Sequence, residues 1–197
     1  MKLLFRSFCC AVIISCLLSL TGFCGACDDI GSRVFRLHII ANSDSEYDQQ
    51  LKLLVRNEIT EYTDSLFAGC KSKEEAMNAA AEHKSEIISR SRAVLRDHGC
   101  NDKVDAYITK MRFDTRVYKD FTLPAGEYDA LRIVIGEGRG HNWWCVLFPA
   151  VCVPSASSSI DDALSGEENE IVRESDRYEI RFKAVEIFQS LLGLFGG

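Results

Sequence analysis

The stretch GRGHNWWCVLFP, residues 138–149, contains both tryptophans of the chain side by side. The glycines at its start favour a turn, because glycine adopts positive φ angles at low cost. The apolar residues that follow predict a β-strand over residues 142–148. Neighbouring residues of a strand point to opposite faces of the sheet, so Trp143 and Trp144 are expected on different faces. One indole can enter the core, and the other must be covered by another part of the protein or by a partner.

Three further segments have the pattern of strands. Residues 34–41 alternate between an apolar and a mixed face, and residues 103–113 and 128–135 are also strand-like. The glycine-rich segment 136–140 is typical of a hairpin turn, which would place strand 142–148 beside strand 128–135.

Two helices are expected between the first and second strands. Ser45 and Ser72 each begin a capping pattern, and Gly69 and Gly99 are natural stops for the helices that follow. A closing helix after Ser175 is apolar around much of its circumference, which predicts packing against the sheet. The fold class is therefore α+β: a single domain with one strand, two helices, three mainly antiparallel strands and a C-terminal helix packed on the sheet.

Residues 1–26 have the layout of a secretory signal peptide. Lys2 and Arg6 precede an apolar run over residues 8–20, which is shorter than the ~20 residues that cross a bilayer comfortably. We expect cleavage after Ala26, which leaves one domain over residues 27–197 and no stable membrane span, although retention as an anchor stays open. Cys27 would then begin the mature chain, and its acylation is an alternative. Cys24 fits that alternative poorly, because a branched apolar residue is expected at its position before an acylated cysteine.

The charge of the remaining chain limits its partners. Residues 1–26 contain two of the 23 basic side chains and no acidic one, so 21 basic and 29 acidic side chains remain, a net charge of −8. This balance argues against nucleic acid and against electrostatic adsorption to anionic lipid. A protein partner or a small ligand is compatible with it. The segment of about 154–170, rich in serine and acidic residues, is typical of a mobile linker.

Five of the nine cysteines lie after residue 26, so one of them has no intramolecular partner. Cys70 and Cys100 flank the predicted second helix, roughly 40 Å apart at 1.5 Å per residue, and we exclude a disulfide between them. Cys145 and Cys152 lie on either side of Phe148-Pro149, where a chain reversal can bring them together. They form either a disulfide or two buried thiols.

The sequence offers little for catalysis. His141 lies four residues before Cys145, but that spacing separates two strand side chains by about 13 Å, beyond hydrogen-bond reach. A secreted thiol-dependent hydrolase using Cys145 is thus only the alternative to a non-catalytic function. His38, Asn42 and Asp44 at the end of the first strand lack the four-ligand spacing of a zinc site, and capping explains Asn42 and Asp44. We expect no enzyme activity, no catalytic residue, no metal and no cofactor.

Two segments carry a family resemblance: FRLHIIANSDS at residues 35–45, and LPAGEYDALR at 123–132 followed by NWWCVLFP at 142–149 and Cys152. In this order they resemble the stage II sporulation protein R family of endospore-forming bacteria, from about Arg33 to Cys152. The chain departs from the family at Ala150-Val151, where Pro-Leu is expected, and in its cysteine-rich signal region.

The resemblance implies a signalling protein that is made in the forespore. Such a protein is exported into the space between the forespore and mother-cell membranes. There it is thought to activate a membrane-embedded aspartic protease, stage II sporulation protein GA, which removes the pro-sequence of sporulation sigma factor E. The family supplies no catalytic residues to carry over.

An activator must bind the active state of its target more tightly than the inactive one. Aromatic anchors are well suited to supply that difference. We therefore predict a protease-binding surface around the exposed tryptophan and the end of the first strand, formed by His38, Asn42, Asp44, His141, Asn142, Trp143 and Trp144. The alternative is that both tryptophans belong to the core.

Overall fold

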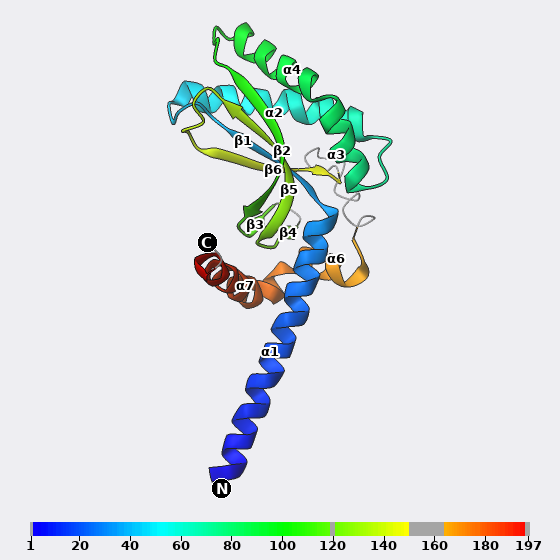
Figure 1. Ribbon diagram of the computed structural model, residues 1–197, viewed down its shortest axis with the longest axis vertical. Helices are drawn as coiled ribbons and strands as arrows, with labels where there is room; N and C mark the ends of the chain where they lie inside the picture. Colours follow the sequence, from blue (N-terminus) through cyan, green and yellow to red (C-terminus); the bar gives the residue numbers. More distant parts are fainter. Residues whose placement is uncertain (1, 119–120, 150–163, 196–197) are drawn as a thin grey trace. The chain divides into compact units, whose positions relative to one another are not determined.

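The computed structural model describes residues 2–118, 121–149 and 164–195 (Figure 1). Contacts divide the chain into two compact units. Unit 1 contains Met1–Gly31, Arg112–Glu127 and Ser165–Gly197, and unit 2 contains Ser32–Met111 and Tyr128–Leu164. The predicted α+β class is confirmed, with helices packed on a mixed sheet. The single domain over residues 27–197 stays a prediction, because a division by contacts does not test which parts fold independently.

The main sheet has four strands in the order β2-β5-β1-β6. These strands are β1 (Phe35–Ile40), β2 (Val104–Phe113), β5 (Gly126–Ile135) and β6 (Asn142–Phe148). β1 is parallel to β5 and antiparallel to β6. The predicted hairpin between β5 and β6 is therefore wrong, since β1 lies between them. Every residue of β1 is buried, which suits a central strand better than an edge strand.

Three helices follow β1: α2 (Glu46–Phe67), α3 (Lys73–Glu82) and α4 (Lys84–Asp97). Both predicted N-caps are confirmed, because the side chains of Ser45 and Ser72 accept hydrogen bonds from backbone amides three residues later. Apolar side chains of these helices and of the four strands form one core. Figure 1 shows α2 and α4 on one face of the sheet.

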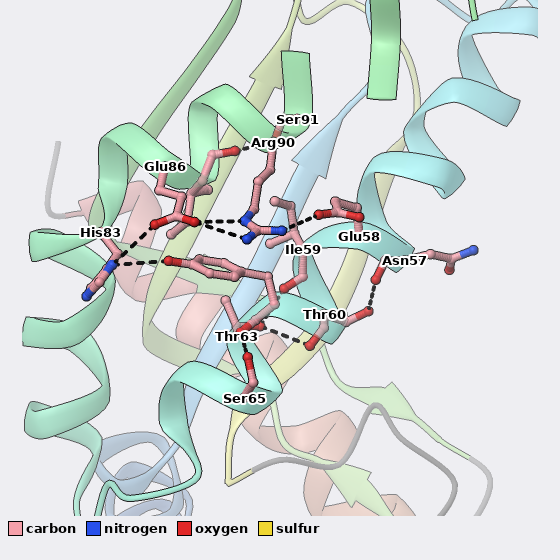
Figure 2. Close-up of polar contacts among 12 residues, drawn as sticks. Asn57, Glu58, Ile59, Thr60, Thr63, Ser65, His83, Glu86, Arg90 and Ser91 are labelled. Carbon is pink, nitrogen blue, oxygen red and sulfur yellow. Dashed lines mark hydrogen bonds and ion pairs between the residues drawn. The ribbon is translucent and has the colours of Figure 1, made fainter. Parts of the chain in front are cut away.

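The predicted long second helix is two helices, because His83 ends α3 and begins α4. The Tyr62 hydroxyl lies 3.1 Å from Nδ1 of His83 and thus joins α2 to the break. Close by, Arg90 of α4 donates to Glu58 of α2 at 2.9 Å and to Glu86 at 3.0 Å (Figure 2). Cys70 and Cys100 are both free, so the exclusion of a disulfide between them is confirmed. The distance estimate behind that exclusion assumed one straight helix, which the break at His83 rules out.

Unit 1 contains α1 (Lys2–Arg33), α6 (Gly166–Arg173), α7 (Ser175–Phe195) and a two-stranded sheet of β3 (Arg116–Val117) and β4 (Thr122–Leu123). α7 lies against this small sheet, where the Thr115 amide donates to Glu186 at 3.3 Å. No helix in the described ranges is both long and apolar enough to cross a membrane.

The predicted linker of about 154–170 is only partly within the described residues, which begin again at residue 164. Its last part is not irregular, because α6 begins at Gly166. Ser165 and Glu168 form a capping box, in which the Ser165 amide donates to the Glu168 carboxylate. The acidic residues that suggested a linker thus also stabilise the first turn of a helix.

Candidate functional site

Two loops at one end of the main sheet lie against each other, and we call them the loop clasp: residues 41–45 after β1 and residues 136–141 before β6. The amide of Gly140 donates to the Ala41 carbonyl at 3.0 Å, and that of Arg139 to the Asn42 carbonyl at 3.1 Å. The Asn42 side chain also accepts from the Glu137 amide at 3.0 Å. These contacts fix the loop before β6 to the end of β1.

Glycines make this approach possible. A Cβ atom at Gly136 would lie 2.2 Å from Oδ1 of Asn42, and one at Gly140 would lie 2.2 Å from the Ser43 carbonyl oxygen. Gly136 and Gly138 also have positive φ angles of 60° and 62°. The sequence indicated a turn here, but its glycines serve to cross over the end of β1 and not to form a hairpin.

Asp44 and His141 meet at the exposed side of the loop clasp. Oδ1 of Asp44 accepts from the His141 amide at 2.6 Å and from its Nδ1 at 2.5 Å. Because a carboxylate only accepts, the Nδ1 atom of His141 is the donor in this contact. The two predicted residues, 97 positions apart in the sequence, are therefore brought together.

Two charged residues of α2 support the loop clasp and were missed by the sequence analysis. The Asp48 carboxylate accepts from Asn42 at 3.1 Å and from Ser43 at 2.5 Å. The Lys52 ammonium donates to the His141 carbonyl at 2.9 Å, and burial lowers its pKa. Both side chains are nearly buried. A signal for them exists in the sequence, because they occur at helical spacing among the apolar positions of α2.

His38 and Trp144 form a stack on one face of the sheet. Their rings are 3.8 Å apart and inclined by only 10°. His38 is 3% exposed, and its Nε2 donates to Oδ1 of Asn142 at 2.8 Å. Burial lowers its pKa to about 4, despite the opposing hydrogen bond to Asn142, and Arg132 lowers it further. His38 is thus a neutral platform under a half-buried indole, while Asn142 is exposed.

Trp143 lies on the other face. It packs against the core shared with the helices, and the guanidinium of Arg56 from α2 lies 4.3 Å from its ring centre. This geometry is that of a cation–π contact. The prediction that the two indoles lie on different faces is confirmed by the register, which pairs Ile39 with Trp143 and His38 with Trp144. Trp143 therefore belongs to the fold, and Trp144 is half-buried on the opposite face.

The thiol chemistry considered for Cys145 has no support in the structure. Cys145 is disulfide-bonded and buried, so it carries no free thiol. Its predicted partner, Cys152, lies outside the described residues, and the pairing stays a prediction. Within the described ranges, no group of three or more His, Cys, Asp or Glu side chains is placed to hold a metal ion.

Comparisons with known proteins place this site in a family. The model of the family described as stage II sporulation protein R matches residues 31–158. The chain is 37% identical over 123 residues to the stage II sporulation protein R of Bacillus subtilis (strain 168), which covers 62% of this chain and 55% of the relative. The chain thus spans about half the length of that relative. No solved structure matches it. Because the family match covers most of the chain, including the loop clasp and both tryptophans, the chain belongs to the stage II sporulation protein R family.

Proposed function

We propose that this protein is an exported sporulation signal that activates a protease and is not itself an enzyme. In this proposal it is made in the forespore and acts in the space between the forespore and mother-cell membranes. Its target is a membrane-embedded aspartic protease, stage II sporulation protein GA, which processes the pro-form of sigma factor E. Family membership supports the sporulation role, and the site supports binding over catalysis.

The observation that carries the binding role is the stack of Trp144 on His38. A half-buried indole held flat against a neutral ring is a rigid apolar anchor, and it loses little conformational entropy when a partner covers it. The exposed Asn142 amide and the Asp44–His141 pair supply polar contacts beside it. This combination of an aromatic anchor and a polar rim is typical of protein-binding surfaces.

Activation requires this surface to distinguish two states of the protease. To shift a population from 1:99 to 99:1, it must bind the active state more tightly by about 5.5 kcal/mol. A desolvated aromatic anchor can supply a large part of that difference. The alternative, a thiol-dependent hydrolase, would need a thiolate at Cys145, and the disulfide leaves none there.

The test is reconstitution of processing. The full chain is co-expressed with the candidate protease and its pro-sigma substrate, and the processed fraction is measured. Trp144→Ala is expected to lower processing at least tenfold when equal amounts of folded protein are compared. Tyr107→Ala, which removes an aromatic ring that is 50% exposed on β2, is the matched control. Normal processing by a folded Trp144→Ala variant would contradict the assigned surface, and no processing by the wild type would contradict the function.

A further inference from the structure

The helix α1 continues without a break through the expected cleavage site. It extends from Lys2 to Arg33, so the bond after Ala26 lies inside a helix. In the folded chain, a protease reaches such a bond only when the helix opens locally, and the rate then follows the population of the opened form. Ala26 is half-buried, and Cys27 on the other side of the bond is buried.

Three side chains of α1 form a buried stripe that extends across this bond. Phe23 is 4% exposed, Cys27 is 2% exposed and Ile30 is fully buried. Their spacing of four and three residues places them on one face of the helix. Phe23 precedes the expected cut, and the other two follow it. Cleavage after Ala26 would therefore divide a single packed surface.

Phe23 packs onto α7, which belongs to the same unit. Its ring is stacked on Tyr178, with centroids 5.6 Å apart and planes inclined by 8°, and it is tilted against Phe182 at 5.4 Å. The Arg181 guanidinium lies 5.8 Å from the Phe23 ring and 5.5 Å from the Tyr178 ring. Such aromatic and cation–π contacts stabilise beyond the area they bury. Loss of Phe23 would uncover Phe182, which is only 5% exposed.

The part of α1 that precedes this stripe has a different environment. Phe5 and Phe8 are 69% and 67% exposed, whereas Phe23 and Cys27 are buried. Burial, the nearby Cys24 and Asp28 raise the pKa of the Cys27 thiol in the docked part of α1 to about 12. A thiol of that pKa is protonated near neutral pH and is a poor nucleophile.

We propose that α1 from Phe23 onward is a permanent element of the folded protein, docked on Tyr178 and Phe182 of α7, and that the exported chain is not cut after Ala26. The apolar run at residues 8–20 then stays covalently attached to unit 1. This inference goes beyond the signalling role. It states that the docked part of α1 permanently covers the aromatic surface of α7, and it replaces the expected cleavage after Ala26 with retention of α1.

The first test reads the N-terminus of the exported protein. The full chain with a C-terminal tag is produced in an endospore-forming host, and the exported fraction is defined by reaction of the tag with an external probe. Mass spectrometry of that fraction is expected to find chains that include Phe23. A fraction that begins mainly at Cys27 would overturn the proposal. Because this readout does not involve the processing of sigma factor, its failure is distinct from failure of the proposed function.

The second test measures the docking contact in the full chain. Phe23→Ala is expected to lower the melting temperature by roughly 5–10 °C and to accelerate proteolysis within residues 20–31. Phe8→Ala is the matched control, since it removes the same ring from an exposed position of the same helix. Tyr178→Ala should have an effect that is not additive with Phe23→Ala, because the two rings share one contact. Equal melting and proteolysis of the Phe23→Ala and Phe8→Ala variants would overturn the proposal.

Discussion

His38 is the residue whose charge state depends most clearly on folding. In the folded chain its ring is covered by Trp144 and its pKa is about 4, mainly because burial removes water from the imidazole. In the unfolded chain the pKa has its ordinary value of 6.5. The unfolded state therefore binds a proton between pH 6.5 and 4 that the native state does not bind. The stabilising contribution is present above pH 6.5 and is lost as the pH falls towards 4.

We predict that the free energy of unfolding decreases by about 3 kcal/mol over this window. His38→Phe retains a ring for Trp144 but cannot bind a proton, so it should flatten the dependence. Denaturant titrations at several pH values provide the measurement. His98→Gln is the control, because His98 is exposed. An unchanged slope in His38→Phe would show that other groups cause the acid sensitivity.

Trp143 has a structural role that a single substitution can separate from that of Trp144. Its indole packs on the core and under Arg56, so Trp143→Ala is expected to lower the free energy of unfolding by about 3 kcal/mol. Far-UV circular dichroism in urea measures this without relying on tryptophan emission. Tyr107→Ala, at an exposed position of β2, should change stability by less than about 0.5 kcal/mol. Equal stability of the two variants would contradict the assignment.

At the scale of elements, the loop clasp is the part where sequence and structure differ most. The caps of α2 and α3 and the alternation in β1 and β6 depend on residues a few positions apart, and these predictions are confirmed. The hairpin between β5 and β6 was wrong because a glycine-rich turn specifies local backbone freedom and not the strand that lies alongside. The break at His83 has no glycine or proline to mark it, and it is held by the distant Tyr62.

Gly140 offers a test of the loop clasp as one element. A Cβ atom there would meet the Ser43 carbonyl oxygen at 2.2 Å and the Ala41 side chain at 2.9 Å, and side-chain rotation cannot relieve a clash with backbone. Gly140→Ala should lower the free energy of unfolding by about 2–3 kcal/mol.

The control for this substitution is Gly69→Ala, because nothing lies within 4 Å of a Cβ atom built at Gly69. Its free energy of unfolding should change by no more than about 0.5 kcal/mol. Both variants can be compared in the same urea titration. If the Gly140→Ala variant were as stable as the Gly69→Ala variant, the two loops would not be in close contact.

At the scale of the whole molecule, Cys145 provides a covalent constraint next to the site. From the sequence, Cys145 and Cys152 could form either a disulfide or two buried thiols. The structure shows that Cys145 is disulfide-bonded. A non-reducing peptide map is expected to recover the Cys145 peptide joined to the Cys152 peptide. Reduction should lower the free energy of unfolding by roughly 2 kcal/mol. Alkylation of Cys145 without a reductant would contradict the pairing.

The seven predicted site residues show what the sequence could and could not determine. They lie together at one end of the main sheet, as the two family-like segments suggested, because β1 and β6 are paired. The sequence could not tell which tryptophan supports the fold. The register of β6 on β1 decides this, because it places Trp143 on the core face and Trp144 on the opposite face. Asp48 and Lys52 were missed because the role of a buried charge depends on loops that are distant in sequence.

The position of β1 at the centre of the sheet has a consequence for how the chain folds. Phe35 pairs with Asp129 on one side and with Phe148 on the other, so the central strand lacks both neighbours until the second half of the chain is present. Pairing between such distant segments is slow and comes late in folding. The topology that buries β1 thus makes closure of the main sheet one of the last steps of folding.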